Sequence, residues 1–240
     1  MPPQVSARQV PVGEDAPILE VMATMRAMRR LKPDPVPREL LERLVEAATW
    51  APSGSNEQQY EFVVVDDRET MARLAELWGR SHDAYIGATR EEAIGRMGRD
   101  KAERLLAALR YQRDHFHETP AIVVPCYQRR TPPAIAARLL AGLGATDAAR
   151  FLGRARRTEL LAEAASVYPG VQNLLLTARA YGLAANITNW HLLLEHEWKR
   201  ELGIPRAVNT YAVIPIGWPL GRFGPVVRRP AREALHWNRW

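Results

Sequence analysis

The chain has 240 residues, of which 47% are hydrophobic and 25% charged, the composition of a globular domain with a buried core. No stretch approaches the roughly 20 consecutive apolar residues of a membrane span, so we expect no membrane partner. The net charge of +6 comes from 33 basic and 27 acidic residues that are interleaved along the chain. No basic patch alternates with aromatic side chains, and we therefore expect no nucleic-acid partner.

The start of the chain and its cysteine content bear on location. Residues 1–5 have neither the basic nor the apolar segment of a signal peptide, and Cys126 is the only cysteine. A chain that cannot build a disulfide framework suits a reducing compartment, so we expect a cytoplasmic protein. Residues 1–15 carry Pro and Gly with little periodicity, which predicts an N-terminal arm before a single domain at residues 16–240.

Helical spacing of apolar residues predicts a first helix from Pro17 to about Leu31, where a proline-rich stretch must end it. A second helix is predicted to begin at Pro37, since proline suits the first turn of a helix. Its apolar face carries Leu40, Leu41, Leu44, Val45 and Ala48. The turn-forming residues 52–56 then precede a short buried strand at residues 62–65.

The middle of the chain alternates long helical stretches with one strand. A mostly helical stretch from about residue 70 to 116 is followed by an apolar strand at residues 121–126. Residues 131–165 are rich in Ala and Arg and are predicted to be helical. Residues 171–181 are apolar on nearly all sides, which predicts a buried helix with Gly182 as its C-cap.

The last part of the chain contains two more predicted strands, at residues 184–188 and 211–216. The tail from Arg222 onwards contains Pro and Gly but also Trp237 and Trp240. Two large aromatic residues in a tail indicate that it packs against something, with another subunit as one candidate. Together these elements predict one α+β domain.

The sequence argues against several kinds of catalytic or metal site. The stretch Gly142–Gly144 lacks the third glycine of a dinucleotide-binding loop, and no P-loop motif occurs. Cys126 lies in an apolar strand, which suits a core residue better than a nucleophile. The histidine pairs 115 and 117, and 191 and 196, lack the spacing of a zinc-binding helix, so we expect no metal. No set of residues has the order of a catalytic triad, and no catalytic side chain is predicted.

Arginines offer another way to hold a phosphate monoester, because the planar guanidinium can bind it through two nitrogens. Arg26 and Arg29 are three residues apart and are expected to share one face of the first helix. Arg228 and Arg229 lie near the other end of the chain. Each arginine alone is more simply a solvated surface residue, so the phosphate interpretation depends on what accompanies them.

A group of polar side chains in and after a turn accompanies the arginines. Ser53, Asn56 and Gln58 carry hydroxyl and amide groups. They could form hydrogen bonds with the uracil-like edge of a flavin, which alternates donors and acceptors. Taken alone, the same residues fit an ordinary Asx turn.

Three motifs, taken in order, resemble the FMN-dependent nitroreductase family from about residue 16 to the end of the chain. They are Met25–Leu31 with Ala51–Gln58, then Ser166–Leu176 with Tyr181–Ala184, and finally Gly221–Pro225 with Arg228–Pro230. The resemblance implies a nitroreductase-like α+β fold, in which helices flank a central, mostly antiparallel sheet. It also implies an intertwined homodimer with FMN bound at the subunit interface.

The resemblance further implies which residues contact FMN. They are Arg26, Ala27, Arg29, Pro52, Ser53, Asn56, Gln58, Leu183, Ala184, Thr188, Arg228 and Arg229. Arg26 and Arg29 would lie near the phosphate or the N1–O2 edge of the ring, and Arg228 would bind the phosphate. The chain departs from the family where Met25 and Ala27 replace the usual Arg and Ser, where Gln-Tyr replaces Pro-Trp after Gln58, and where Ala184 replaces a glycine. The missing phosphate contact is expected to weaken FMN binding unless Arg228 or Arg229 compensates.

The implied activity is that of an FMN-dependent NAD(P)H oxidoreductase. NADH or NADPH would transfer hydride to flavin N5 and leave, and a nitroaromatic, quinone or related small oxidant would then be reduced, in a ping-pong scheme. The same scaffold also serves reductive dehalogenation, ene reduction and flavin breakdown, and nothing in the sequence selects among them. The alternative from another class is a degenerate, non-catalytic relative that binds or stores a flavin.

Overall fold

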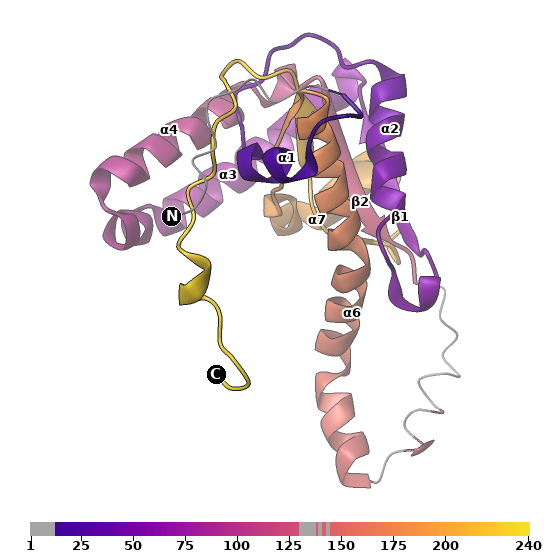
Figure 1. Ribbon diagram of the computed structural model, residues 1–240. Helices are drawn as coiled ribbons and strands as arrows, with labels where there is room; N and C mark the ends of the chain where they lie inside the picture. Colours follow the sequence, from indigo (N-terminus) through magenta and orange to yellow (C-terminus); the bar gives the residue numbers. More distant parts are fainter. Residues whose placement is uncertain (1–12, 130–137, 139–140, 143–144) are drawn as a thin grey trace.

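The protein's computed structural model describes residues 13–129, 138, 141–142 and 145–240 (Figure 1). At its centre is a 5-stranded sheet in the order β1-β2-β5-β3, with β4 paired to β2. The strands are β1 (Tyr60–Val65), β2 (Ala121–Tyr127), β3 (Ala184–Ala185), β4 (Asn209–Thr210) and β5 (Ile214–Gly217). Their pairings are antiparallel. The predicted α+β fold around a mostly antiparallel sheet is confirmed.

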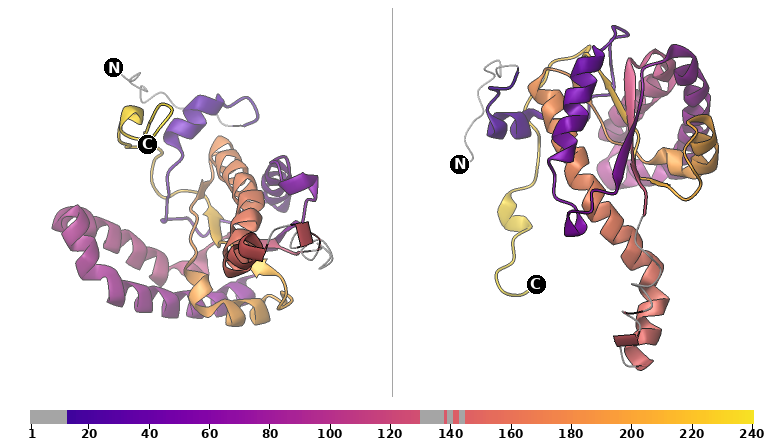
Figure 2. Two further views of the ribbon diagram at one scale, coloured as in Figure 1. Left: turned by 90° about the horizontal axis from the view of Figure 1, so that it is seen from below. Right: turned by 90° about the vertical axis from the view of Figure 1, so that its right-hand side faces the viewer.

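Helices α2 (Arg38–Thr49) and α6 (Ala145–Ala180) cover one face of the sheet, and α1 (Ile18–Thr24) packs against α6 (Figure 2). The apolar face predicted for the second helix is confirmed, with Leu41 and Leu44 buried. They pack in one core with Leu174 of α6 and Val123 of β2. Burial of these aliphatic side chains is the main contribution that holds the two helices on the sheet.

Helices α3 (Arg68–Met97) and α7 (Glu195–Glu201) cover the opposite face, and α4 (Arg99–Asp114) packs along α3 (Figure 1). Trp78 of α3 and Trp198 of α7 are almost fully buried there, together with Ile122 and Val124 of β2. Because side chains alternate along a strand, Val123 between them faces the α6 side instead. Short 3₁₀ turns complete the fold at η1 (Gly54–Asn56), η2 (Phe116–Glu118), η3 (Trp190–Leu194) and η4 (Ala231–Glu233).

The first helix is shorter than the sequence predicts. Helix α1 ends at Thr24, and residues 25–30 are not helical. Their neighbourhood is tied to the C-terminal segment by backbone hydrogen bonds from Lys32 N–H to Trp218 O (2.8 Å), from Leu220 N–H to Arg30 O (3.1 Å) and from Val226 N–H to Ala23 O (2.8 Å). The prediction of a helix up to Leu31 is wrong, because partners far along the chain satisfy backbone groups that a helix would have used. Arg26 and Arg29 therefore do not share a helix face.

The long helical stretches are confirmed, with one break and one fusion. Gly98, at a φ of +84°, separates α3 from α4 within the stretch predicted at residues 70–116, since glycine adopts this left-handed region without a steric penalty. Helix α6 joins the helices predicted at 131–165 and 171–181 into one. The part of the first prediction at residues 131–137, 139–140 and 143–144 lies outside the described residues.

The backbone of α6 rests directly on the end of α2 at Gly170, just after Pro169 inside the helix. A Cβ atom at Gly170 would lie 2.8 Å from the carbonyl oxygen of Ala48, which is closer than real contacts. Three residues further on, Asn173 Nδ2 donates to Ala47 O at 3.2 Å. Glycine is therefore required at this crossing, and the crossing fixes the point from which α2 leads into the 51–58 loop.

Gly182 ends α6 as predicted. Its φ is +78°, its N–H donates to Arg179 O (3.1 Å), and Leu183 N–H donates to Ala178 O (2.8 Å), which is the bonding pattern of a Schellman cap. The strand predicted at residues 184–188 is interrupted: β3 covers only Ala184–Ala185, and Thr188 pairs with Val213 in an isolated bridge. The strand predicted at 211–216 becomes β5, and the short β4 before it was not predicted.

Two parts of the chain extend away from this body, namely the first half of α6 and the tail that follows Val226 (Figures 1 and 2). In the tail, Trp237 is 79% exposed and Trp240 102% exposed, so the two indoles find no cover within the described chain. Among the helices of the described ranges, none is long and apolar enough to cross a membrane. The boundary predicted at residue 15 stays a prediction, since residues 1–12 lie outside the described part.

Candidate functional site

A pocket of 330 Å³ opens where α1, α6, the chain after β3 and the C-terminal segment meet. We call it the α1–α6 pocket. Its walls are formed by Met22, Met25, Ala27, Gln172, Leu175, Asn186, Ile187, Val226 and Arg228. The hydrogen bonds that hold residues 25–30 beside the C-terminal segment explain why Ala27 and Arg228, which are distant in sequence, line the same pocket. The pocket thus brings together two of the predicted site residues.

Three arginines have no carboxylate partner among the described residues: Arg228 lines the pocket, and Arg26 and Arg29 precede and follow the pocket residue Ala27 in the chain. The guanidinium of Arg228 donates only to Val227 O, at 2.9 Å. Arg26 is exposed, and its Nη1 lies 3.4 Å from the position that a Cβ on Gly224 would take. Arg29 is partly buried, and this desolvation lowers its pKa. Unpaired cations beside a pocket provide the charge that an anionic ligand requires.

A buried amide that the sequence did not predict as a site residue faces the same pocket. Asn186 is only 2% exposed, and its Oδ1 accepts a hydrogen bond of 3.1 Å from Nε2 of Gln112 on α4, which is also buried. With its oxygen held in this way, the Nδ2 group of Asn186 has no hydrogen-bond partner among the described residues. It can therefore donate to a ligand in the pocket. The pair joins residues far apart in the sequence, and no local motif indicates it.

The loop at residues 51–58 is held by one hydrogen bond to α6 and one within the loop. Gly54 N–H donates to Ser166 Oγ on α6, and Gln58 N–H donates to Ser53 Oγ, both at 3.1 Å. Asn56 and Gln58 have positive φ values of 54° and 51°, a region that non-glycine residues rarely adopt. Pro52, Asn56 and Gln58 are exposed. A loop that keeps strained backbone and exposed polar groups is typical of a binding site.

In one chain, however, this loop and α1, which borders the pocket, lie on different sides of α6 (Figure 1). The loop contacts Ser166, whereas the pocket contacts Leu175, nine residues later (175 − 166). Nine residues make about two and a half helical turns and roughly 13 Å along the axis. The structure therefore does not bring Pro52, Ser53, Asn56 and Gln58 to the pocket of the same chain.

The remaining predicted residues occupy varied positions. Leu183 and Ala184 are buried in the core at 1% and 0% exposure. The backbone N–H groups of Leu183 and Thr188 already donate to Ala178 O and Val213 O. Arg229 is exposed and makes no hydrogen bond or ion pair with the described residues. Between these positions, Asn186 and Ile187 are the residues of this segment that line the pocket.

Other hollows of similar size differ from the α1–α6 pocket in their charges. One of 470 Å³ between α2 and β1 contains Arg38, which is paired with Asp66 at 2.6 Å. One of 440 Å³ between α3 and α4 contains Arg113, which is paired with Asp83 at 2.8 Å. These arginines already have counter-ions within the protein, so an anionic ligand would have to displace a carboxylate. No group of three or more potential metal ligands occurs in the described part of the chain.

Cys126 is a core residue, as predicted. It is 1% exposed, and burial raises the pKa of its thiol to about 12. His191 is also fully buried, its Nε2 lies 3.1 Å from Thr210 Oγ1, and burial lowers its pKa to about 4. Neither group lines the α1–α6 pocket.

Several known proteins are similar to this chain in sequence or in fold. The NADH dehydrogenase of Thermus thermophilus is 27% identical over 217 residues, which cover 89% of this chain and 92% of that protein. The iodotyrosine deiodinase of Danio rerio is 35% identical over 57 residues, which make up 24% of this chain and only 19% of that protein. Among solved structures, an oxidized iodotyrosine deiodinase bound to FMN and 3-iodo-L-tyrosine is similar to this chain with a TM-score of 0.66 at 18% identity.

That structural match covers 93% of this chain and 100% of the solved chain, and at this identity it shows the shared fold. The profile of the nitroreductase family matches residues 22–218, which include the end of α1, the 51–58 loop, the sheet and α6. The profile spans the first two of the three motifs found in the sequence, whereas the third, at residues 221–230, follows its end. The chain is a member of the nitroreductase family of oxidoreductases.

Proposed function

We propose that this chain binds FMN and acts as an NAD(P)H oxidoreductase that reduces nitroaromatic, quinone or related small acceptors in a ping-pong order. Membership of the nitroreductase family supports the oxidoreductase class, and the solved deiodinase was bound to FMN. The observation that carries the proposal is the α1–α6 pocket, where Arg228 and the neighbouring Arg26 and Arg29 have no carboxylate partner among the described residues.

The residues around the pocket fit the chemical groups of FMN. Its volume of 330 Å³ lies within the range of roughly 300–1,000 Å³ typical of small-molecule sites. Arg228 and Arg26 would bind the phosphate, Arg29 would lie toward the N1–O2 edge of the ring, and Asn186 would donate a hydrogen bond from Nδ2. Apolar contact would come from Met22, Met25, Leu175 and Ile187.

When bound, FMN supplies the carrier that accepts hydride from NADH or NADPH and passes it to the acceptor, so the chain needs no acid or base of its own. The protein's own contribution is to bind FMN and to place positive charge near the flavin ring. Arg29 is our candidate for stabilising negative charge on the flavin, because it is a partly desolvated cation without a counter-ion in the described residues. Such a cation stabilises a nearby negative charge more strongly than a fully hydrated one does.

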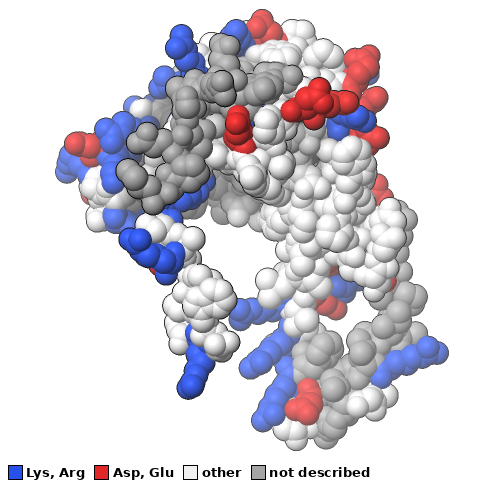
Figure 3. Space-filling view, in the orientation of Figure 1, with Lys and Arg blue, Asp and Glu red and all other residues white. Residues whose placement is uncertain are grey.

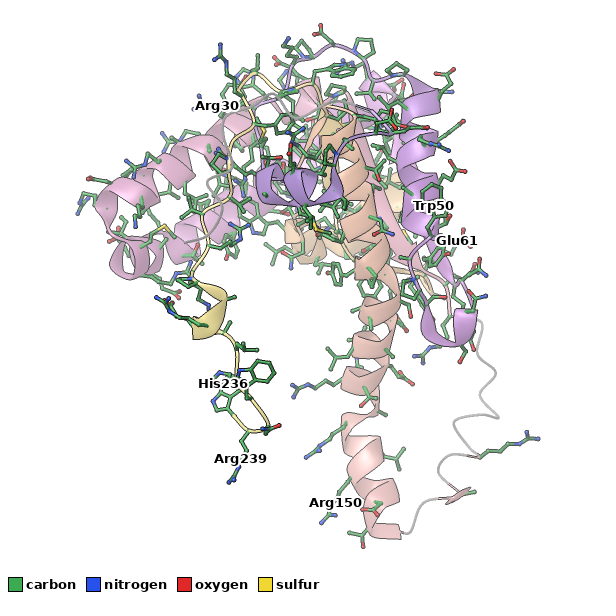
Figure 4. The ribbon with its side chains drawn as sticks, in the orientation of Figure 1. Arg30, Trp50, Glu61, Arg150, His236 and Arg239 are labelled. Carbon is green, nitrogen blue, oxygen red and sulfur yellow. The ribbon has the colours of Figure 1, made fainter. Side chains whose placement is uncertain are left out.

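We further propose that the working site belongs to a homodimer, in which the second copy supplies the 51–58 loop that the first cannot bring to its own pocket. The projecting parts of the chain support this. Figure 4 shows Arg150 near the start of α6, and His236 and Arg239 on the tail, all remote from the sheet. Large apolar side chains are exposed on these parts at Leu152, Leu160, Leu161, Leu235, Trp237 and Trp240. Exposed apolar groups on projecting segments mark protein–protein contacts.

The charge distribution agrees with a contact between copies. On the face drawn in Figure 3, basic side chains lie on the tail and on the first half of α6, whereas acidic side chains gather around α2. The tail contains Arg228, Arg229, Arg232 and Arg239 against Glu233 alone. A basic tail and an acidic region around α2 are complementary surfaces for two copies of the same chain.

Mixed dimers test the shared site. In R228Q homodimers both pockets lack the arginine, and in N56A homodimers both lack the loop contact. If the site is built from two chains, a mixture of the two variants that is unfolded and refolded together should recover activity. This follows because one site of each mixed dimer is intact. If each pocket used only its own chain, the mixture would be no more active than the average of the two variants.

Titration with FMN followed by assay of NAD(P)H oxidation tests the function itself. We expect saturable FMN binding, and oxidation of NADH or NADPH that accelerates when a quinone or nitroaromatic is added. Binding without turnover would instead favour a flavin-storage protein, the reading that the Met25 and Ala27 replacements keep open. A protein that binds no FMN would contradict the proposal. We also propose a cytoplasmic location, since the only cysteine is a buried free thiol.

A further inference from the structure

Arg179 lies in the last turn of α6 and joins three segments of the fold. It is only 4% exposed. Its Nε donates to Thr24 Oγ1 at the end of α1, at 3.0 Å, and its guanidinium lies 4.0 Å from the ring centroid of Phe223 in the C-terminal segment. The side chain is therefore held in one orientation by a hydrogen bond on its edge and a ring on its face.

The charge of Arg179 lacks a counter-ion among the residues that the structure describes. No carboxylate pairs with it in the described part of the chain, and desolvation lowers its pKa. Its two terminal nitrogens make no hydrogen bond with the described residues, yet they are not among the fully buried nitrogens and oxygens that lack a partner. They therefore remain accessible to a ligand. A buried guanidinium is costly unless an anion or several acceptors meet it, so this arrangement calls for a partner.

The neighbours of Arg179 place it beside the α1–α6 pocket. Leu175, which lines the pocket, precedes it by one helical turn and so lies on the same face of α6. Thr24, which accepts its hydrogen bond, is followed directly by the pocket residue Met25. Phe223, which covers its face, precedes the pocket residue Val226 by three positions. Two contacts and one neighbour along the helix thus lead to the same side of the pocket, next to Met25, which offers no charge.

We propose that Arg179 is a phosphate-binding residue of this protein, and that its terminal nitrogens supply the charge-assisted contact with the FMN phosphate that Met25 cannot make. This assignment rests on the proposed FMN site. Arg179 serves this purpose better than Arg229, which is exposed and is not held by any hydrogen bond to the described residues. A guanidinium that is already oriented loses less conformational entropy on binding than a free one.

The test compares the dissociation constants of FMN and riboflavin, which differ only in the phosphate, for wild type and variants. We expect the wild type to prefer FMN. Arg179→Gln should weaken FMN binding roughly 10- to 100-fold, the size of a lost charge-assisted contact, and leave riboflavin binding unchanged. Arg179→Lys keeps the cation and should fall between the two. Arg206→Gln is the matched control: Arg206 is exposed and does not line the pocket, so this variant should keep the full preference for FMN.

A purely structural role for Arg179 would give a different result. Phe223→Leu removes the ring that helps to orient the guanidinium without changing its charge, so it should reduce the preference for FMN less than Arg179→Gln does. If Arg179→Gln weakens both flavins equally, or neither, the assignment is overturned even though the FMN site stands. If the wild type binds riboflavin as tightly as FMN, no arginine contributes to affinity by binding the phosphate, and the assignment fails as well. A wild type that binds neither flavin would overturn the proposed function together with it. Circular dichroism shows whether each variant is folded. If Arg179→Gln does not fold, the comparison is made with Arg179→Lys instead.

Discussion

Replacing Gly170 with alanine should destabilise the protein, although alanine is the better helix former. Gly170 lies inside α6, where the helix crosses the end of α2. The added Cβ would lie 2.8 Å from Ala48 O, 3.5 Å from Ala48 C and 3.7 Å from Ala48 Cβ. Two of these three contacts involve backbone, which cannot rotate away as a side chain does. Restoring an ordinary contact of 3.4 Å to the oxygen requires the two helices to separate by 0.6 Å (3.4 − 2.8).

The expected cost follows from three terms. Overpacking of this kind costs about 1–3 kcal/mol, because neighbouring groups must move in a close-packed interior. Separation of the helices also weakens the hydrogen bond from Asn173 Nδ2 to Ala47 O, worth about 1 kcal/mol. The better helix propensity of alanine returns about 1 kcal/mol. The net expectation for Gly170→Ala is a loss of about 1–3 kcal/mol in the free energy of unfolding.

Urea denaturation at a fixed protein concentration measures this difference, since the stability of an oligomer depends on concentration. Gly87→Ala in α3 is the matched control: a Cβ there meets no atom within 4 Å, and the exposed position should gain about 0.5–1 kcal/mol. If Gly170→Ala were as stable as the wild type or more stable while Gly87→Ala behaved as expected, the α2–α6 crossing would be looser than described.

Three further predictions concern single side chains. Arg228→Gln should raise the dissociation constant of FMN roughly 10-fold or more without changing the melting temperature of the flavin-free protein, because among the described residues its guanidinium bonds only to a neighbouring carbonyl; an unchanged FMN titration would contradict this. Hydrogen bonds from Arg113 and then His82 lower the pKa of Asp83 to about 2. The stability lost in Asp83→Asn should therefore be constant above about pH 4, near the unfolded pKa, and disappear as the pH falls to about 2; a difference that grows toward low pH would have the wrong sign. Burial raises the pKa of Cys126 to about 12, so at pH 8 a thiol reagent should label it only after denaturation, and rapid labelling of the native protein would refute its burial.

The parts of the fold that follow from local pattern were predictable from the sequence. The apolar face of α2, the β2 strand and the glycine cap of α6 each depend on residues close together in the chain, and each is confirmed. The strand predicted at residues 62–65 also forms, as part of β1, but it lies at the edge of the sheet and only its Val65 is buried, so the prediction that it is buried is wrong. The error at the end of the first helix has the opposite origin. The spacing of apolar residues up to Met28 fits a helix, but hydrogen bonds to residues 218–226 decide the conformation there. Such distant partners leave no local signal.

The same distinction applies to the site. Ala27 and Arg228 were predicted through their motifs, and both line the α1–α6 pocket. Asn186 was missed because its orientation depends on Gln112, 74 residues away. Arg179 was missed because its partner Thr24 lies 155 residues away. The position of the 51–58 loop across α6 could not be predicted either, since it depends on how α2 and α6 cross.

The most direct test of the central claim is the anaerobic absorption spectrum of the FMN-loaded protein. Addition of NADH or NADPH should bleach the visible flavin band, and addition of a quinone or nitroaromatic should restore it. Full bleaching and recovery is the result that the proposed oxidoreductase requires. A bound flavin that neither nicotinamide bleaches, under conditions in which a chemical reductant does, would contradict the claim and leave a flavin-binding protein without this activity.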